Sequence, residues 1–321
     1  MKRLVLLLLL AALAAPAGEL LRVENSLDAM GTTYTVVAYG PDRNVLIAAT
    51  EQAFEEVRRV GRMLSNYRPE SELSQVNRLA AQRPVAVGAE VFQLLAGCVE
   101  YGRLSQGAFD ITVGPLMKLW GFHKGSGRLP HRAEIRGVLG RVGYKNILLD
   151  PGAQTVRFAR PGIELDPGGV GKGYAVDRMV AVLREHGLNS ALVTAGGSSI
   201  YALGAPPGDE GWKVKIRNPK RPGETIDEMT LRDLSMSTSG NYEKFFRAEG
   251  KLYSHIMDPR TGYPAQGVLS VSVISPKTLD SEVWAKPFYI LGRDWAVRNK
   301  PKGFRVFLCE DKAGMACAWL Q

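Results

Sequence analysis

A glycine-rich run between a predicted strand and a predicted helix is the part of this chain best suited to phosphate chemistry. It reads Asp-Pro-Gly-Gly-Val-Gly-Lys-Gly over residues 166–173, with the positive charge of Lys172 inside it. Its glycines let main-chain N–H groups approach a ligand, and the N-terminus of the following helix favours an anion. The run is not a Walker A loop, which needs Gly at Asp166 and Ser or Thr at Gly173, and Tyr174 breaks a dinucleotide fingerprint. Phosphate contact is the functional interpretation, and a tight structural turn is the alternative.

A second segment contains a histidine that could lie beside reacting phosphate oxygens. Residues 253–264 read Tyr-Ser-His-Ile-Met-Asp-Pro-Arg-Thr-Gly-Tyr-Pro, so His255 precedes an Asp-Pro pair and a Thr-Gly turn. These turn residues could hold the imidazole in one orientation. The alternative is a histidine with a structural role only.

A third segment combines an aromatic ring with a carboxylate. Residues 107–115 read Gly-Ala-Phe-Asp-Ile-Thr-Val-Gly-Pro, which places Phe109 beside Asp110 in a glycine-flanked turn. The ring could stack on a flat ligand while the carboxylate hydrogen-bonds to it. The alternative is a strand that enters the core. Two shorter segments, residues 194–198 and 237–242, are weak signals on their own.

The elements around these segments mix strands and helices without a regular βαβ repeat. Runs of β-branched and aromatic residues predict strands, and apolar residues at helical spacing predict helices. The predicted strands cover residues 30–39, 146–150, 155–159, 163–166, 191–195, 212–217 and 268–274, with a last hairpin at about 304–320. The predicted helices cover 45–64, a short stretch capped by Ser71, Val91 to Tyr101, Val176 to Leu183, and 281–291. This mixture predicts an α+β fold, in one compact unit that can divide into two lobes.

Composition places the chain among ordinary globular proteins. It has 321 residues, 45% hydrophobic and 23% charged, which excludes wholesale disorder and collagen-like or coiled-coil architectures. Residues 1–17 combine a basic start, a short apolar run and an Ala-Pro-Ala site, the features of a cleavable signal peptide. No cysteine follows that run, which argues against a lipoprotein anchor. We therefore expect an exported, periplasmic or extracytoplasmic protein whose working unit is residues 18–321.

Charge and cysteine content narrow the class of ligand. Without residues 1–17 the chain keeps 39 Lys and Arg against 32 Asp and Glu, a net charge of +7. This modest, dispersed surplus fits solubility or an anionic small molecule better than nucleic acid. The cysteines Cys98, Cys309 and Cys317 lack metal-ligand spacing. Cys309 and Cys317 flank a predicted turn, and the strand register decides whether they come close enough for a disulfide.

Taken together and in this order, the segments resemble the ApbE family of FAD:protein FMN transferases over about residues 28–292. The resemblance rests on residues 166–173 and 255–264, with supporting matches at residues 30–32, 65–67, 108–110, 195–197 and 239–240. It implies an exported enzyme that binds FAD with Mg²⁺, breaks its pyrophosphate, attaches FMN to a threonine hydroxyl of an acceptor flavoprotein and releases AMP. Such phosphoryl transfer needs positioning and neutralisation of phosphate charge, which Mg²⁺ and lysine supply. The implied partners are FAD and the acceptor, with membrane association only through the acceptor.

The resemblance also implies roles for individual residues. The main-chain carbonyl of Gly169 would bind the metal, and His255 would lie near the reacting phosphates. A histidine or a carboxylate within reach could take the proton of the acceptor hydroxyl. The residues that would contact FAD are Met30, Tyr67, Ala108, Phe109, Asp110, Asp166, Lys172 and His255.

The chain departs from the family's pattern at two metal-binding positions. Glu282 stands where the family has an Asp, and Lys286 stands where it has a Thr. Glu can still bind Mg²⁺, whereas a charged ammonium group offers no acceptor. Asp280 would supply a carboxylate if the alignment slipped by two residues. Three interpretations are open: Mg²⁺ held by Gly169 and Glu282 with Lys286 assisting the leaving phosphate, a Lys286–Glu282 pair standing in for one metal ion, or a degenerate site.

These interpretations correspond to different functions. We expect a FAD:protein FMN transferase in which His255, Glu282 and Lys286 act at the reacting phosphates. A close variant would hydrolyse FAD to FMN and AMP, with water in place of the threonine hydroxyl. A degenerate site would leave a non-catalytic FAD-binding protein. The glycine-rich run alone is also compatible with another dinucleotide.

Overall fold

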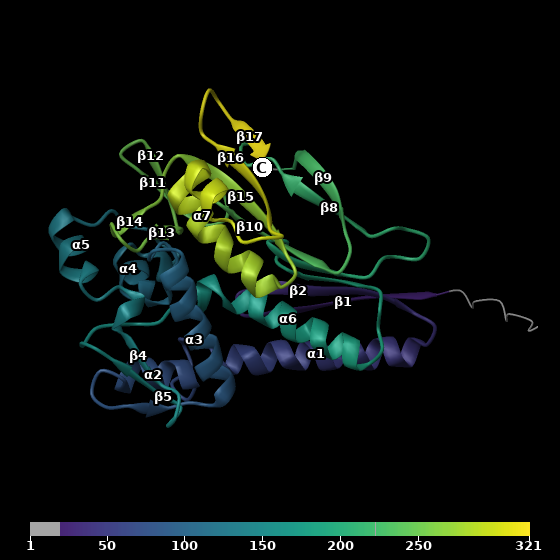
Figure 1. Cartoon of the computed structure of the whole chain (residues 1–321), viewed down its shortest axis with the longest axis horizontal. Helices are drawn as coiled ribbons and strands as arrows, with labels where there is room; N and C mark the ends of the chain where they lie inside the picture. Colours follow the sequence, from purple (N-terminus) through teal and green to yellow (C-terminus); the bar gives the residue numbers. More distant parts are fainter. Residues whose placement is uncertain (1–19, 222) are drawn as a thin grey trace, which may run out of the picture.

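An eight-stranded antiparallel sheet forms the centre of the molecule (Figure 1). The computed structural model describes residues 20–221 and 223–321, so the predicted signal peptide at residues 1–17 lies outside the described residues. The strand order is β1-β2-β6-β7-β10-β15-β16-β17. These strands are β1 (Leu21–Ala29), β2 (Thr32–Gly40), β6 (Ala191–Ala195), β7 (Ser199–Leu203), β10 (Leu234–Gly240), β15 (Val268–Ser275), β16 (Arg305–Glu310) and β17 (Ala316–Trp319).

Side chains that alternate along the strands give the sheet two apolar faces. In β2, Val36 and Ala38 pack into the cluster under the long helices, whereas Val37 and Tyr39 pack into the cluster on the opposite face. The first face is covered by α1 (Arg43–Met63), α6 (Gly171–Glu185) and α7 (Thr278–Asn299), with α6 between the other two (Figure 1). The second face is covered by the hairpin of β8 (Trp212–Arg217) and β9 (Thr225–Leu231). Strand β15, covered on both faces, is therefore buried along its whole length.

A smaller lobe lies beside these helices (Figure 1). Its helices are α2 (Glu72–Leu79), α3 (Ala89–Leu104), α4 (Gly114–Leu119) and α5 (Arg132–Leu139), and its sheet has the order β3 (Val85–Ala86), β5 (Thr155–Phe158), β4 (Ile147–Asp150). Two short hairpins follow β10 along the chain, β11 (Phe245–Ala248) with β12 (Lys251–Ser254) and β13 (Met257–Asp258) with β14 (Tyr263–Pro264). Trp120, fully buried in the lobe, donates its indole N–H to the carbonyl of Gly262 at 2.9 Å. This bond ties the lobe to the segment that contains His255.

The predicted α+β class is confirmed, because the large sheet is antiparallel and its long helices gather on one face. The predicted cap of the short helix is also confirmed, since the Ser71 hydroxyl accepts the Ser74 N–H at 3.0 Å. Strand β1 and most of the short strands were not predicted. The last helix, predicted at 281–291, begins at Thr278 and is interrupted at Gly292, after which a further helical stretch runs to Asn299. In residues 20–221 and 223–321, no helix has both the length and the apolar character needed to cross a membrane.

Two strand predictions are wrong. Residues 163–166 are not part of a sheet, because the main chain of Leu165 bonds to the side chain of Asn77 instead of to a neighbouring strand. The strand alternative for residues 107–115 fails as well, since Asp110 caps a 3-10 turn, Ile111–Val113, that leads into α4.

The register of the last hairpin decides whether Cys309 and Cys317 are close enough to form a disulfide. Cys309 lies opposite Cys317 in the β16–β17 pairing, with their Cα atoms 4.1 Å apart. The two residues form a disulfide, and Cys98 is a free, buried thiol.

Candidate functional site

A pocket of about 540 Å³ lies between the smaller lobe, the start of α6 and the first half of α7. Its volume falls within the range of about 300–1,000 Å³ that is typical of small-molecule sites. The pocket brings together every residue that the sequence singled out for FAD, metal or catalysis: Met30, Tyr67, Ala108, Phe109, Asp110, Asp166, Gly169, Lys172, His255, Glu282 and Lys286.

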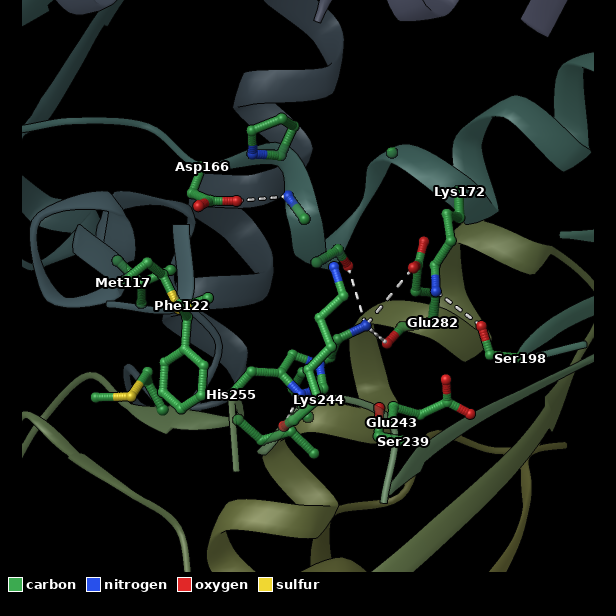
Figure 2. Close-up of a pocket in the computed structure, with 18 of the residues that line it drawn as sticks. Met117, Phe122, Asp166, Lys172, Ser198, Ser239, Glu243, Lys244, His255 and Glu282 are labelled. Carbon is green, nitrogen blue, oxygen red and sulfur yellow. Dashed lines mark hydrogen bonds and ion pairs between the residues drawn. The ribbon is translucent and has the colours of Figure 1, made fainter. Parts of the chain in front are cut away.

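The pocket has a charged end and an apolar end. Figure 2 shows Lys172, Ser198 and Glu282 gathered on one side, and Met117 and Phe122 on the other. The Lys172 ammonium group donates to the Ser198 hydroxyl at 2.7 Å. Such a division suits an elongated ligand with an anionic part and a flat apolar part.

The glycine-rich run forms a 3-10 turn, Pro167–Gly169, followed at once by α6. The Asp166 carboxylate begins this turn by accepting the Gly168 N–H at 2.7 Å, so it serves a local structural purpose as well as lining the pocket (Figure 2). Burial raises the pKa of Asp166 above its usual range. Glycine is required at position 173, because a Cβ there would lie 2.6 Å from the Thr278 carbonyl oxygen of α7. Helices α6 and α7 therefore meet closely at the pocket.

The start of α7 is held against α6 by hydrogen bonds. The Asp177 carboxylate of α6 accepts the N–H groups of Thr278 and Leu279 at 2.7 and 2.9 Å, which satisfies donors that a helix N-terminus leaves free. One turn further along, the Glu282 side chain is 3% exposed and accepts the Gly173 N–H at 2.5 Å. Glu282 is thus a buried link between the two helices.

Asp280 does not take the place of Glu282. Its carboxylate accepts a hydrogen bond from the Tyr101 hydroxyl, and the residue is not among those that line the pocket. Asp280 therefore offers no carboxylate to the pocket.

The ammonium group of Lys286 contacts the carbonyl oxygens of both predicted metal ligands. Its Nζ atom lies 2.7 Å from the Glu282 carbonyl oxygen, 3.3 Å from the Gly169 carbonyl oxygen and 3.8 Å from the Glu282 carboxylate. Burial lowers the pKa of Lys286 to about 8, although the Glu282 carboxylate opposes this shift. The group is still largely protonated at neutral pH.

His255 is held as a neutral imidazole. Its Nδ1 atom lies 3.1 Å from the Lys244 carbonyl oxygen. Because a carbonyl oxygen can only accept, Nδ1 carries the proton and Nε2 keeps a free lone pair. Burial, with smaller contributions from the charges of Lys244, Lys286 and Lys172, lowers the pKa of His255 to about 4. Geometry and protonation state both fit a proton acceptor at neutral pH.

The remaining predicted residues also line the pocket. Asp110 is buried, and its carboxylate is engaged by the Thr112 hydroxyl at 2.6 Å and by the N–H groups of Thr112 and Tyr144. That carboxylate shapes the turn beside Phe109, whereas Phe109 itself packs at the pocket wall. Tyr67 is 74% exposed and its ring stacks on His123 with centroids 5.0 Å apart. An exposed, stacked ring pair at the pocket mouth can receive a further flat ring.

Comparison with known proteins decides the family. The protein-family model described as "ApbE family" matches residues 30–307, well over half of the chain. The chain belongs to the ApbE family.

The names of similar proteins agree with this assignment. The chain is 34% identical over 267 residues to a protein named FAD:protein FMN transferase from Klebsiella pneumoniae (strain 342), covering 82% of this chain and 80% of that protein. It is 34% identical over 289 residues to a protein of the same name from Treponema pallidum (strain Nichols), covering 84% and 80%. Among solved structures, the ApbE protein of Thermotoga maritima superposes with a TM-score of 0.86 at 30% identity, covering 93% of this chain and 96% of that one.

Several pocket residues of this ApbE member were not predicted from its sequence. Glu243 and Lys244 follow directly after residues 237–242, a segment that the sequence marked only weakly, and their position there was the available signal. His123 and Ser198 also line the pocket. Ser198 is the last residue of segment 194–198, which the sequence also marked only weakly, whereas nothing local marks His123.

Proposed function

We propose that this chain is a FAD:protein FMN transferase, which breaks the pyrophosphate of FAD, attaches FMN to a threonine hydroxyl of an acceptor flavoprotein and releases AMP. The observation that carries the proposal is the convergence, in one pocket, of a helix N-terminus, three lysines, a neutral histidine and aromatic side chains. Family membership and the names of the relatives support the same activity.

The charged end of the pocket suits the pyrophosphate. Gly171 and Lys172, which begin α6, line the pocket together with Lys286 of α7. Fixed positive groups of this kind stabilise charge on phosphate oxygens during transfer. The aromatic side chains of Phe109, Phe122 and Tyr67 also line the pocket, and the flat isoalloxazine ring can pack against such rings.

The chemical step then needs a nucleophile and a proton acceptor. The threonine oxygen attacks the phosphorus of the FMN half, a new P–O bond forms, and the P–O bond to the phosphate of AMP breaks. The threonine proton passes to Nε2 of His255, whose neutral state and free lone pair make it the best-placed base. AMP leaves with the bridging oxygen.

The residues at the predicted metal position do not fit Mg²⁺, which needs near-octahedral oxygen ligands at about 2.0–2.1 Å. The Gly169 carbonyl accepts a hydrogen bond from Lys286, and the Glu282 carboxylate accepts one from Gly173. Protonated Lys286 has no lone pair to offer. Within the described residues, no group of three His, Cys, Asp or Glu is arranged to hold a metal ion. We therefore derive no step through a metal.

Export is part of the proposal. The signal-peptide features of residues 1–17 support an enzyme that works outside the cytoplasm on periplasmic or membrane flavoproteins, reaching the membrane only through its acceptor. Fusing residues 1–30 to a reporter that is active only after export tests this: we expect reporter activity and cleavage near residue 17, and an inactive, uncleaved fusion would contradict it.

Transfer is tested with purified protein, FAD, Mg²⁺ and an acceptor domain that carries a target threonine. We expect the acceptor mass to rise by one FMN, with one AMP released for each modification. An acceptor with that threonine replaced by alanine is the matched control and should stay unmodified. AMP release that is equal with both acceptors would indicate FAD hydrolysis instead. Bound FAD with neither product would indicate a non-catalytic flavin-binding protein.

A further inference from the structure

We infer that Lys286 takes the place of a divalent cation in this chain. Its ammonium group, held by Gly169 and Glu282, supplies the positive charge that pairs with the pyrophosphate, and FMN transfer does not require Mg²⁺. The identity of the anion rests on the proposed function. The position of the ammonium group rests on geometry alone.

The ammonium group lies among oxygen atoms from two distant parts of the chain. Glu282 and Lys286 are four residues apart, so they share one face of α7 and lie one turn from each other. Their contact places Nζ 2.7 Å from the Glu282 carbonyl oxygen, and the turn before α6 brings the Gly169 carbonyl oxygen to 3.3 Å. Carbonyl and carboxylate oxygens are the ligand types that hard cations take. Here the cation is part of the protein.

One donor of this ammonium group is left for a ligand. A lysine ammonium has three N–H bonds, and two of them are used by the carbonyls of Glu282 and Gly169. The Lys286 side chain is 21% exposed and lines the pocket, so the third N–H is available to an anion there. Lys172 lies at the same end of the pocket. Lys172 and Lys286 therefore offer two positive charges that can pair with the two negative charges of a dinucleotide pyrophosphate, and Lys244 is a third lysine of the same pocket.

The same arrangement works against a metal ion at Gly169. A cation bound to this carbonyl would share the oxygen with the Lys286 ammonium, and like charges at such short range repel strongly. One oxygen of the Glu282 carboxylate accepts the Gly173 N–H, and the other lies 3.8 Å from the Lys286 ammonium group, so a cation at that second oxygen would meet the same repulsion. The two departures from the family's pattern are therefore coupled: lysine brings its own charge, and the longer arm of Glu reaches the start of α6.

Metal binding tests the inference without reference to catalysis. Mn²⁺ replaces Mg²⁺ as the probe, because both prefer oxygen ligands and free Mn²⁺ has an EPR signal that is lost on binding. Mn²⁺ is titrated into the purified protein with FAD, and the titration of FAD alone is subtracted. We expect no stoichiometric binding by the natural chain, and one Mn²⁺ per chain in Glu282→Asp/Lys286→Thr. One tightly bound Mn²⁺ in the natural chain, or none in the double variant, would overturn the inference.

Activity provides the second test. In EDTA, we expect the natural chain to keep at least half of its transfer rate in Mg²⁺. Lys286→Thr should lose at least tenfold in EDTA, and Mg²⁺ should restore transfer in the double variant. Lys302→Thr removes an exposed ammonium group outside the pocket and should match the natural chain. A tenfold loss by the natural chain in EDTA that Mg²⁺ reverses would refute the inference.

The two proposals fail in different ways. If FAD binds but no condition gives transfer, the proposed function is wrong, and the Mn²⁺ titration still decides the role of Lys286. That titration on the natural chain needs no variant, so it is unaffected if a substitution impairs folding. Thermal melts of the three variants identify such an impairment.

Discussion

Replacement of Gly173 by alanine should destabilise the protein, although alanine is the better helix former. Gly173 lies in the first turn of α6 and donates its N–H to Glu282 at 2.5 Å. A methyl group there would lie 2.6 Å from the Thr278 carbonyl oxygen and 2.8 Å from the Glu282 carboxylate, whereas ordinary contacts of a Cβ begin at 3.4 Å. The start of α7 must therefore move by about 0.8 Å. The atoms in the way are mostly main chain, so rotation of a side chain cannot relieve the clash.

Three effects set the size of this destabilisation: two lower the free energy of unfolding and one raises it. Overpacking of this kind costs about 1–3 kcal/mol. Weakening a hydrogen bond to a charged acceptor costs about 1.5–3 kcal/mol. The higher helix propensity of alanine returns about 1 kcal/mol. We expect a net loss of about 1.5–5 kcal/mol in the free energy of unfolding, or a fall of about 2–8 °C in Tm.

Gly137 offers a matched control for this substitution. It is exposed in α5, and a Cβ at that position would meet no atom within 4 Å. Gly137→Ala should therefore raise the free energy of unfolding by about 1 kcal/mol, through helix propensity alone. Urea unfolding of both variants measures the difference. A Gly173→Ala protein as stable as the natural one would show that α6 and α7 are not in the close contact described above, and would refute the reasoning.

Three further predictions concern His255 and the disulfide. His255→Gln should lower FMN transfer by about 10²–10⁴-fold while FAD affinity, measured by fluorescence, stays within a few-fold; an unchanged rate would mean that the imidazole does not take the proton. Because the pKa of His255 is lowered to about 4, its stabilising effect is complete above the unfolded-state pKa of about 6.5 and is lost as the pH falls toward 4. Relative to His255→Gln, the natural chain should thus lose at most about 1.4 kcal/mol of unfolding free energy per pH unit over that window. If urea unfolding gave the same difference in stability between the two proteins at pH 7 and at pH 5, this prediction would be contradicted. Replacing Cys309 and Cys317 by serine should lower the free energy of unfolding by about 2.5 kcal/mol, because the disulfide closes a separation of 8 residues. Reductant should lower the stability of the natural chain by the same amount. No loss in either experiment would show that the disulfide does not form.

Local patterns were sufficient for the long elements. The helical spacing over 45–64 and the strand-like runs at 191–195, 212–217 and 268–274 all correspond to observed elements, because each depends on residues a few positions apart. The errors arose where the main chain has a distant partner. Residues 163–166 have strand-like composition, yet Asn77, 88 positions from Leu165, bonds the main chain of Leu165, and the Asp166 N–H bonds the Ile111 carbonyl.

The candidate site was predicted through a resemblance of ordered motifs, and all of its predicted residues line one pocket. Local spacing did not show what each side chain does there. The carboxylate of Asp110 caps a turn by accepting the N–H groups of Thr112 and Tyr144. The carboxylate of Asp280 accepts the Tyr101 hydroxyl outside the pocket. These outcomes depend on neighbours that only folding brings together.

The sequence by itself determined that Lys286 and Glu282 share one face of a helix, since a spacing of four residues sets that relation within any α-helix. It also showed that a lysine stands where the family has a metal ligand. Only the tertiary structure decided where the ammonium group goes. Gly169 is 117 residues from Lys286, and their contact at 3.3 Å exists because α6 packs closely against α7 at Gly173 and Asp177 binds the start of α7. Such a distance is set by packing across the fold, which residue spacing along the chain does not encode.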